Sequence, residues 1–114
     1  MPADTNAAGD IFGGWIMSQV DMAGAITAHD RAKGRIVTVA VNSFHFHAPV
    51  YVGDVVSCYA HVVRVGNTSL TVDIEVYAER GRNPEQCVRV TEATFTYVAV
   101  NQDGKPRPVD NTQS

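Results

Sequence analysis

The hydrophobic pattern of this chain changes once, near Gly34, and that change limits the folds open to it. Before it, residues 6–33 carry apolar and small side chains at the three- and four-residue spacing of a helix. After it, apolar residues recur at every second position, as in β-strands with one buried face. Four such segments span residues 35–48, 55–65, 68–80 and 86–100. One long helix followed by four long strands predicts an α+β fold, with an antiparallel sheet wrapped on the helix.

Length and composition fit a single globular domain. The 114 residues, 45% of them hydrophobic and 18% charged, suffice for one buried core and not for two. We therefore expect one domain over residues 1–100 and a flexible polar tail over residues 101–114. A net charge of -3 argues against a nucleic-acid-binding protein, which would carry a basic face.

No segment has the pattern of a membrane span or a secretory signal. The apolar runs fall short of the roughly 20 residues that cross a bilayer, and the N-terminus lacks a basic start followed by an apolar core. Cys58 and Cys87 lie in strand-like segments without metal-ligand spacing. We expect reduced thiols rather than a disulfide or a metal site, and a cytoplasmic protein.

An aspartate and two glycines mark the start of the predicted helix. Asp10 precedes the apolar run, where its carboxylate can accept from free backbone N–H groups as an N-cap. Gly13 and Gly14 follow, although glycine costs about 1 kcal/mol relative to alanine inside a helix. They indicate either a tight turn into the helix or a ligand that closely approaches its first turn.

A carboxylate lies in the middle of one helix face. Steps of three and four residues from Gly14 lead through Met17 and Ser18 to Asp21 and then to Gly24. Because the side chains around Asp21 are small or apolar, its carboxylate either faces water or belongs to a functional site.

Five segments together carry a family resemblance. The longest, at residues 6–24, reads N-A-A-G-D-I-F-G-G-W-I-M-S-Q-V-D-M-A-G. The others are G-R-I-V-T-V-A-V at 34–41, V-G-D-V-V-S-C-Y-A at 52–60, R-V-G-N-T-S at 64–69 and T-E-A-T-F-T-Y-V-A-V at 91–100. The chain closely resembles acyl-CoA thioesterases of the bacterial YciA type and their cytosolic animal relatives. The resemblance implies a hotdog fold, a curved antiparallel sheet around one long helix. Such proteins also carry a short strand ahead of the Met1-Pro2 position, which would pair a sheet edge.

The resemblance implies hydrolysis of a fatty acyl-CoA to the free acid and coenzyme A, with no metal and no bound cofactor. Thioester hydrolysis needs a base or a carboxylate nucleophile, and donors for the developing oxyanion. Asp21 matches the family's catalytic carboxylate. We interpret Asp10, with the backbone amides of Gly13 and Gly14, as the group that positions the thioester and water.

These residues cannot all act on one substrate from a single helix. Asp21 lies seven residues beyond Gly14, which is ~10 Å along a helix at 1.5 Å per residue. We therefore expect a composite site, in which the glycine turn of one protomer faces Asp21 of its partner. The resemblance agrees, because it implies two equivalent sites at a dimer interface and a hexamer built from three dimers.

The resemblance also points to residues for the coenzyme A part of the substrate. The candidates are Asn6, Arg64, Gly66, Asn67, Thr68 and Ser69. In residues 64–69 the glycine permits close backbone approach, the polar side chains suit a phosphate or an amide, and the arginine supplies charge. A plain hairpin turn explains the same segment equally well. A second basic group, Arg31, Lys33 and Arg35, either meets the nucleotide or offsets the helix dipole.

Two other functions and one other site remain open from the residues. A hotdog acyl-thioester dehydratase normally uses a histidine and an acidic residue, and no histidine lies near Asp21 in sequence. A non-hydrolytic acyl-CoA-binding protein is the second alternative. His45 and His47 share a strand face and offer two metal ligands, but no third ligand follows at a suggestive spacing. We therefore expect a polar face or a contact between protomers there.

Overall fold

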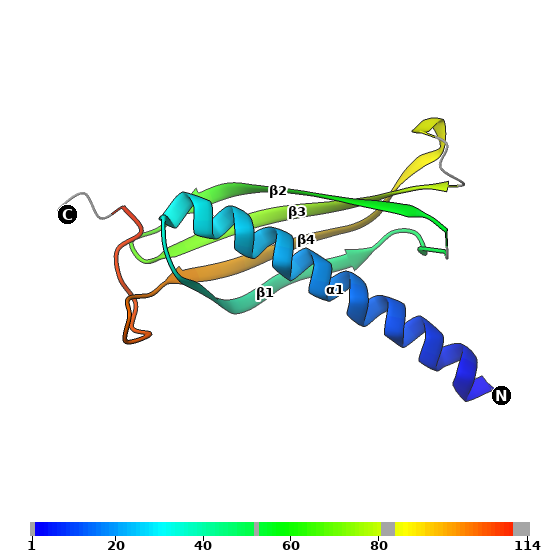
Figure 1. The fold of residues 1–114 in the computed structure, drawn as a ribbon, viewed down its shortest axis with the longest axis horizontal. Coiled ribbons are helices and arrows are strands. Elements are labelled where there is room, and N and C mark those ends of the chain that lie inside the picture. The colour runs from blue at the N-terminus through cyan, green and yellow to red at the C-terminus, as the bar shows by residue number, and fades with distance from the viewer. Residues whose placement is uncertain (1, 52, 81–83, 111–114) are drawn as a thin grey trace.

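The computed structural model describes residues 2–51, 53–80 and 84–110, with the backbone alone for residues 2–13 and 84. The chain begins with one long helix, α1 (Pro2–Ala32). The strands that follow are β1 (Ile36–Phe46), β2 (Val55–Val65), β3 (Ser69–Glu79) and, after the short 3-10 helix η2 (Pro84–Gln86), β4 (Cys87–Ala99). Figure 1 shows this order along the chain. The predicted strand limits agree with the observed ones to within two residues.

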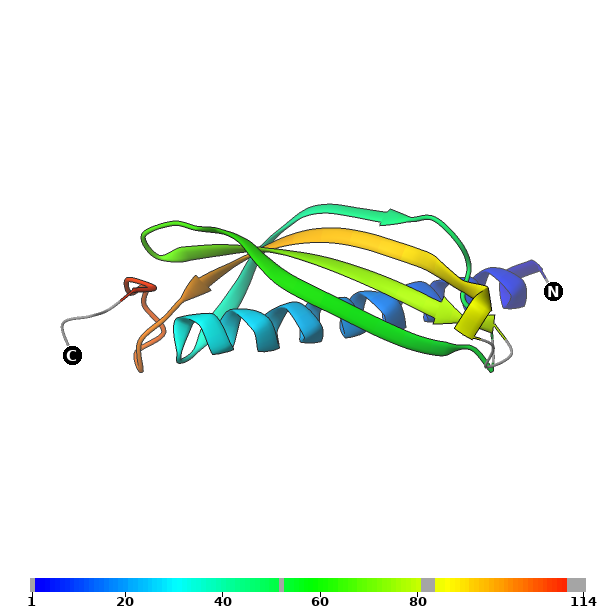
Figure 2. The same cartoon turned by 90° about the horizontal axis from the view of Figure 1, so that it is seen from above.

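The four strands form one antiparallel sheet in the order β1-β4-β3-β2. Helix α1 lies along one face of the sheet, which arches over it (Figures 1 and 2). The opposite face, called the outer face here, has no helix over it in the described part of the chain. The predicted α+β class is therefore confirmed. Among the described residues, no helix combines the length and the apolar character that a bilayer crossing demands.

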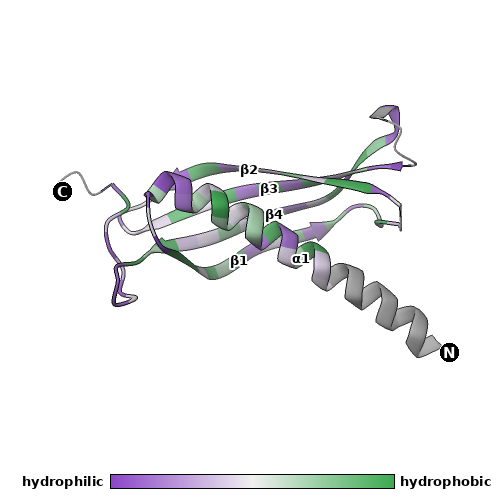
Figure 3. Cartoon of the chain, in the orientation of Figure 1, coloured by the Kyte–Doolittle hydropathy of each residue, from purple (hydrophilic) through white to green (hydrophobic). Residues whose placement is uncertain are grey.

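The core lies between α1 and the two central strands. Along β3, residues alternate between fully buried and partly exposed, as the period-two pattern predicts. The fully buried side chains include Leu70, Val72, Ile74 and Val76 of β3, Phe95 and Tyr97 of β4, and Ile16 and Val20 of α1. The edge strands β1 and β2 instead expose several large apolar side chains. Figure 3 colours the hydrophobic residues along these strands green.

Helix α1 begins earlier than the sequence indicates. It starts at Pro2 and continues without a break through Asp10 and the glycine pair. The predictions that Asp10 caps the helix and that Gly13 and Gly14 form its entry turn are therefore wrong. Proline is tolerated in the first turn of a helix, and the alanines that follow are strong helix formers, so this segment does not need a cap at Asp10.

The end of α1 also differs in detail from the prediction. Lys33, and not Gly34, takes the left-handed conformation that closes the helix, with φ 56°. The amides of Lys33 and Gly34 both donate to the carbonyl oxygen of His29. A Cβ at Gly34 would lie 2.6 Å from a guanidinium nitrogen of Arg107, so a larger residue there would force this side chain to move.

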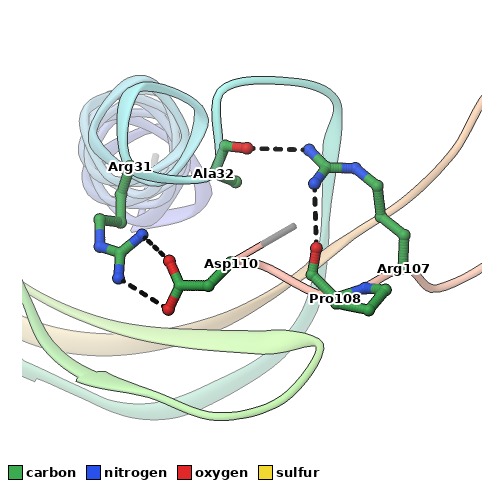
Figure 4. A network of polar contacts seen from close by, with 5 residues as sticks. All are labelled: Arg31, Ala32, Arg107, Pro108 and Asp110. Atoms are coloured by element: carbon green, nitrogen blue, oxygen red, sulfur yellow. Dashed lines mark hydrogen bonds and ion pairs between the residues drawn. The ribbon is translucent and has the colours of Figure 1, made fainter. Parts of the chain in front are cut away.

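Residues 101–110 fold back on the domain, and we call them the C-terminal strap. Arg31 binds the Asp110 carboxylate through two hydrogen bonds, of 2.7 and 3.2 Å, and Arg107 donates to the Ala32 carbonyl oxygen. Figure 4 shows both contacts. Val109 is buried, and its amide donates to the Asn67 carbonyl oxygen. The prediction of a flexible tail is therefore wrong for residues 101–110. Residues 111–114 lie outside the described residues.

Candidate active site

The carboxylate of Asp21 is held between the helix and the sheet. Asp21 is half-buried in the middle of α1. The hydroxyl of Thr38 in β1 donates to its Oδ1 atom at 2.9 Å. The phenol of Tyr97 in β4 lies 3.1 Å from the same Oδ1 and 3.1 Å from the backbone oxygen of Asp21. No bond to Asp21 Oδ2 is found among the described residues, so that oxygen remains available to a reacting group.

The strand register explains why Thr38 and Tyr97 meet at one carboxylate. The two residues are direct partners in the β1–β4 ladder, so their side chains leave the sheet on the same face. A β-bulge follows Thr38 in β1. Bulges bend a strand and re-aim its side chains, which suits a site at this position.

Sequence reasoning found Asp21 and missed its two partners. Tyr97 is a polar group at a buried strand position, and a phenol there indicates a hydrogen-bond partner in the core. The pairing of β1 with β4 joins residues 59 positions apart (97 − 38), and nothing in the sequence pattern alone gives this register.

The electrostatics keep Tyr97 a hydrogen-bond donor. Its side chain is fully buried. Burial first, then the negative charge of Asp21 and the hydrogen bond to it, raise the pKa of the Tyr97 phenol. The phenol therefore stays protonated at neutral pH and donates to the carboxylate.

The other residues predicted for the chemistry do not converge on Asp21 within one chain. Gly14 lies in the same continuous helix, ~10 Å from Asp21 along its axis. It is exposed, and a Cβ built on it would meet no atom within 4 Å. Asn6, Asp10 and Gly13 also lie in α1, and the structure describes only their backbone.

The predicted coenzyme A segment forms the turn between β2 and β3. The Gly66 amide donates to the Ser69 carbonyl oxygen, and the Thr68 carbonyl oxygen accepts from β4. A Cβ at Gly66 would lie 2.8 Å from Ser69 Oγ, so a larger residue there would force the Ser69 side chain to move. Asn67 is exposed at the turn, and Arg64 is exposed just before it. This turn and the end of α1 lie at the same end of the molecule (Figure 1).

An open cavity of about 850 Å³ lies beside the end of α1. Its lining includes Arg31, Lys33, Arg35, Arg107 and Asp110. Two of its arginines already have partners in the strap and at the helix end. Arg31 thus joins an ion pair, whereas no hydrogen bond or ion pair of Lys33 and Arg35 side chains is found in the described ranges.

The histidine pair considered for a metal lies elsewhere on the sheet. His47 Nε2 lies 3.1 Å from Glu92 Oε2, and His45 is paired with Glu92 in the β1–β4 ladder. The described residues contain no group of three or more side chains placed to hold a metal ion. His47 therefore belongs to a polar network that includes Arg89, 3.3 Å from Glu92.

Comparison with known families fits this arrangement. Residues 8–85, more than half of the chain, match the family model of the Thioesterase superfamily. The chain belongs to this superfamily. Within the Thioesterase superfamily, it is 56% identical over 111 residues to the acyl-CoA thioester hydrolase YciA of Salmonella typhimurium, a match that covers 96% of this chain and 84% of the relative.

Solved structures of thioesterases have the same fold. The hexameric thioesterase y2039 of Yersinia pestis matches with a TM-score of 0.83 and 54% identity, over 97% of this chain and 90% of that one. A hexameric hotdog fold thioesterase of Campylobacter jejuni matches with a TM-score of 0.80 and 50% identity, over 95% and 83%. The expected hotdog fold is thus confirmed.

Proposed function

We propose that this protein hydrolyses acyl-CoA thioesters to a free fatty acid and coenzyme A, with Asp21 as the general base or nucleophile. The observation that carries the proposal is the Asp21 carboxylate, held through one oxygen by Thr38 and Tyr97 and open at the other. The name of the YciA relative, an acyl-CoA thioester hydrolase at 56% identity, supports the substrate class.

The carboxylate can act in two ways. As a base, Oδ2 takes a proton from water while the water oxygen attacks the thioester carbonyl carbon. As a nucleophile, Oδ2 itself attacks that carbon and forms an acyl anhydride, which water then hydrolyses. In both routes the carbon–sulfur bond breaks, the thiolate of coenzyme A leaves and is protonated, and one water is consumed.

The oxyanion formed on the way needs donors. We retain Asp10, Gly13 and Gly14 as the segment that positions the thioester, supported by the open space around Gly14. Inside α1 an amide bonds to the carbonyl four residues earlier. The Gly13 and Gly14 amides therefore serve as donors only when the preceding turns of α1 unwind around the substrate or a partner chain.

We further propose that the site is completed across a two-fold contact. A single continuous helix carries both Gly14 and Asp21, so the two groups meet at one carbonyl only if they come from different chains. Exposed Met22 and Ile26 on α1 supply apolar surface for such a contact. The relatives from Yersinia pestis and Campylobacter jejuni are hexameric, which supports a trimer of dimers here.

Residues 64–69 are proposed to bind the coenzyme A part, together with Asn6 of a partner chain, because Asn6 lies toward the opposite end of α1 from this turn. From Asp21 to the end of α1, beside this turn, the distance along the helix axis is ~16 Å. Such a separation suits a substrate with its thioester at one end and its phosphates at the other. The two free cysteines support a cytoplasmic location.

A thiol-release assay with palmitoyl-CoA and shorter acyl-CoAs tests the function. We expect turnover by the wild-type protein and its near-complete loss in Asp21→Ala, with the oligomer intact in solution. Asp30→Ala is the matched control, because it removes an exposed carboxylate from the same helix. A fully active Asp21→Ala protein contradicts the proposal, and tight acyl-CoA binding without thiol release would favour the non-hydrolytic alternative.

A further inference from the structure

Gly24 in α1 has no side chain, and this leaves room for the Tyr97 hydroxyl. Gly24 lies one helical turn beyond Asp21 on the same side of the helix, and it is buried. A Cβ built on Gly24 would lie 2.2 Å from the Tyr97 hydroxyl oxygen and 3.0 Å from Cζ of the same ring. It would also lie 3.1 Å from Cδ1 of Ile74. Any other residue at position 24 therefore displaces the phenol from the place where it contacts Asp21.

Glycine inside a helix is destabilising relative to alanine, so this position has a cost. The helix gains nothing locally from Gly24, because its φ lies outside the left-handed region. The contact it permits is the one between Tyr97 and the Asp21 carboxylate. The position of Gly24 therefore has its explanation in the site, and not in the helix.

We infer that Gly24 and Tyr97 form a positioning pair for Asp21. Gly24 opens the inner face of α1, and the Tyr97 hydroxyl then fixes Oδ1 of the carboxylate so that Oδ2 points to the reacting water or thioester. Neither residue touches the reacting atoms in this scheme. The inference rests on the proposed function of Asp21 and adds the two residues that orient it.

Tyr97 holds the Asp21 carboxylate firmly because its ring is buried and packed. Its ring is fully buried and stacks against Phe95, with ring centroids 6.3 Å apart, so the phenol cannot turn away. Thr38 holds the same oxygen from an exposed position on the edge strand β1. Thr38 and Tyr97 are the groups that face the Asp21 carboxylate from β1 and β4. Tyr97 is the more rigid of the two.

Tyr97→Phe tests the pair with the least change to the core, because it keeps the ring and removes only the hydroxyl. We expect kcat to fall about tenfold to a hundredfold, the range for losing a hydrogen bond to a charged group. KM should change little, since the substrate loses no contact.

Gly24→Ala tests the other half through a double-mutant cycle. Alone, the added methyl should lower kcat by pushing the phenol off Asp21. In the Tyr97→Phe background the closest clash is gone with the hydroxyl, so the same alanine should add little further loss. Equal, additive losses in the two backgrounds would separate Gly24 from Tyr97 and overturn the pair.

Tyr77→Phe is the matched control, since it removes a phenolic hydroxyl from β3 on the outer face. We expect wild-type kinetics for it. The carboxyl carbon resonance of Asp21, followed by NMR, gives a readout independent of turnover and should shift in Tyr97→Phe, because the hydrogen bond to Oδ1 is lost. Wild-type kcat in Tyr97→Phe, or a loss of kcat with an unchanged Asp21 carboxyl resonance, overturns the inference. Absence of thiol release by the wild-type protein would instead reject the proposed function, while the NMR result still decides the contact.

Discussion

Thr38 is the exposed member of the two hydroxyls that hold Asp21. Its β-branched side chain has few rotamers in a strand, so its hydroxyl is directed by the backbone of β1. Valine has the same shape and lacks the hydroxyl. The Thr38 position therefore allows the hydrogen bond to be removed with little change in packing.

Thr38→Val is expected to lower kcat about tenfold, because Tyr97 alone then holds Oδ1 and a hydrogen bond to a charged group is lost. Steady-state thiol release measures this. Thr38→Ser keeps the hydroxyl and should retain most of the activity. Activity that is kept in Thr38→Val and lost in Thr38→Ser would show that the methyl group, and not the hydroxyl, is what the site needs.

Arg64→Glu is expected to raise KM for acyl-CoA several-fold with a smaller effect on kcat. Arg64 is exposed beside the β2–β3 turn, far along the helix from Asp21, so a contact with phosphate there acts on binding and not on the chemical step. Arg89→Glu makes the same charge change elsewhere on the sheet and serves as the control. An unchanged KM in Arg64→Glu removes this residue from the site.

The C-terminal strap ties the end of α1 to the β2–β3 turn. Arg31 and Arg107 connect it to the helix, and the buried Val109 connects it to Asn67. Arg31, mainly through its hydrogen bonds, holds the pKa of the Asp110 carboxyl below its usual range. A carboxyl with a depressed pKa in the folded state stabilises the fold above its unfolded pKa, and that contribution disappears as pH falls through the folded pKa.

Asp110→Asn is therefore expected to lower Tm near neutral pH and to have no effect once the pH lies below the folded-state pKa, where the carboxyl is protonated in either state. Thermal unfolding across this range measures it. The effect is small because both groups lie at the surface, and it should shrink with added salt. A destabilisation that persists in acid would show that Asp110 acts through packing instead of charge.

At the level of elements, the strands were predictable and the two chain ends were not. Alternating apolar residues set the limits of β3 almost to the residue, because one buried face forces that pattern. The start of α1 is hard to predict because Asp10 has the local signature of an N-cap, while Pro2 and the alanines before Asp10 let the helix begin earlier. The strap was misread because its ordering depends on Arg31 and Asn67, which no local pattern in residues 101–110 reveals.

The whole molecule is elongated. Its radius of gyration is 16.4 Å, against about 13 Å for a compact domain of this length. Its extents are 55 × 34 × 19 Å, and the first turns of α1 project beyond the sheet (Figure 1). Large apolar side chains are exposed on α1 and on both edge strands, among them Met22, Ile26, Val41, Phe46 and Tyr59. Such a shape and surface are typical of a subunit that associates with further copies.

A mixture of two inactive variants tests whether the site is shared. Asp21→Ala removes the carboxylate from one half of the proposed composite site. Gly14→Val fills the open space around Gly14, which belongs to the other half. If each site takes one half from each chain, random pairing of the two variants should restore about a quarter of wild-type turnover, since half of the dimers then carry one intact site. Co-expression followed by the thiol-release assay measures it. No recovery in proven mixed dimers would place both groups within one chain.

The lack of a side chain at Gly24 has an evolutionary consequence. Because the absent side chain there and the phenolic oxygen at position 97 compete for one volume, the two positions cannot drift independently. A lineage that gained alanine at position 24 would need a smaller side chain at position 97 to relieve the clash. Among descendants of a common ancestor, substitutions at these two sites should therefore arrive as linked events.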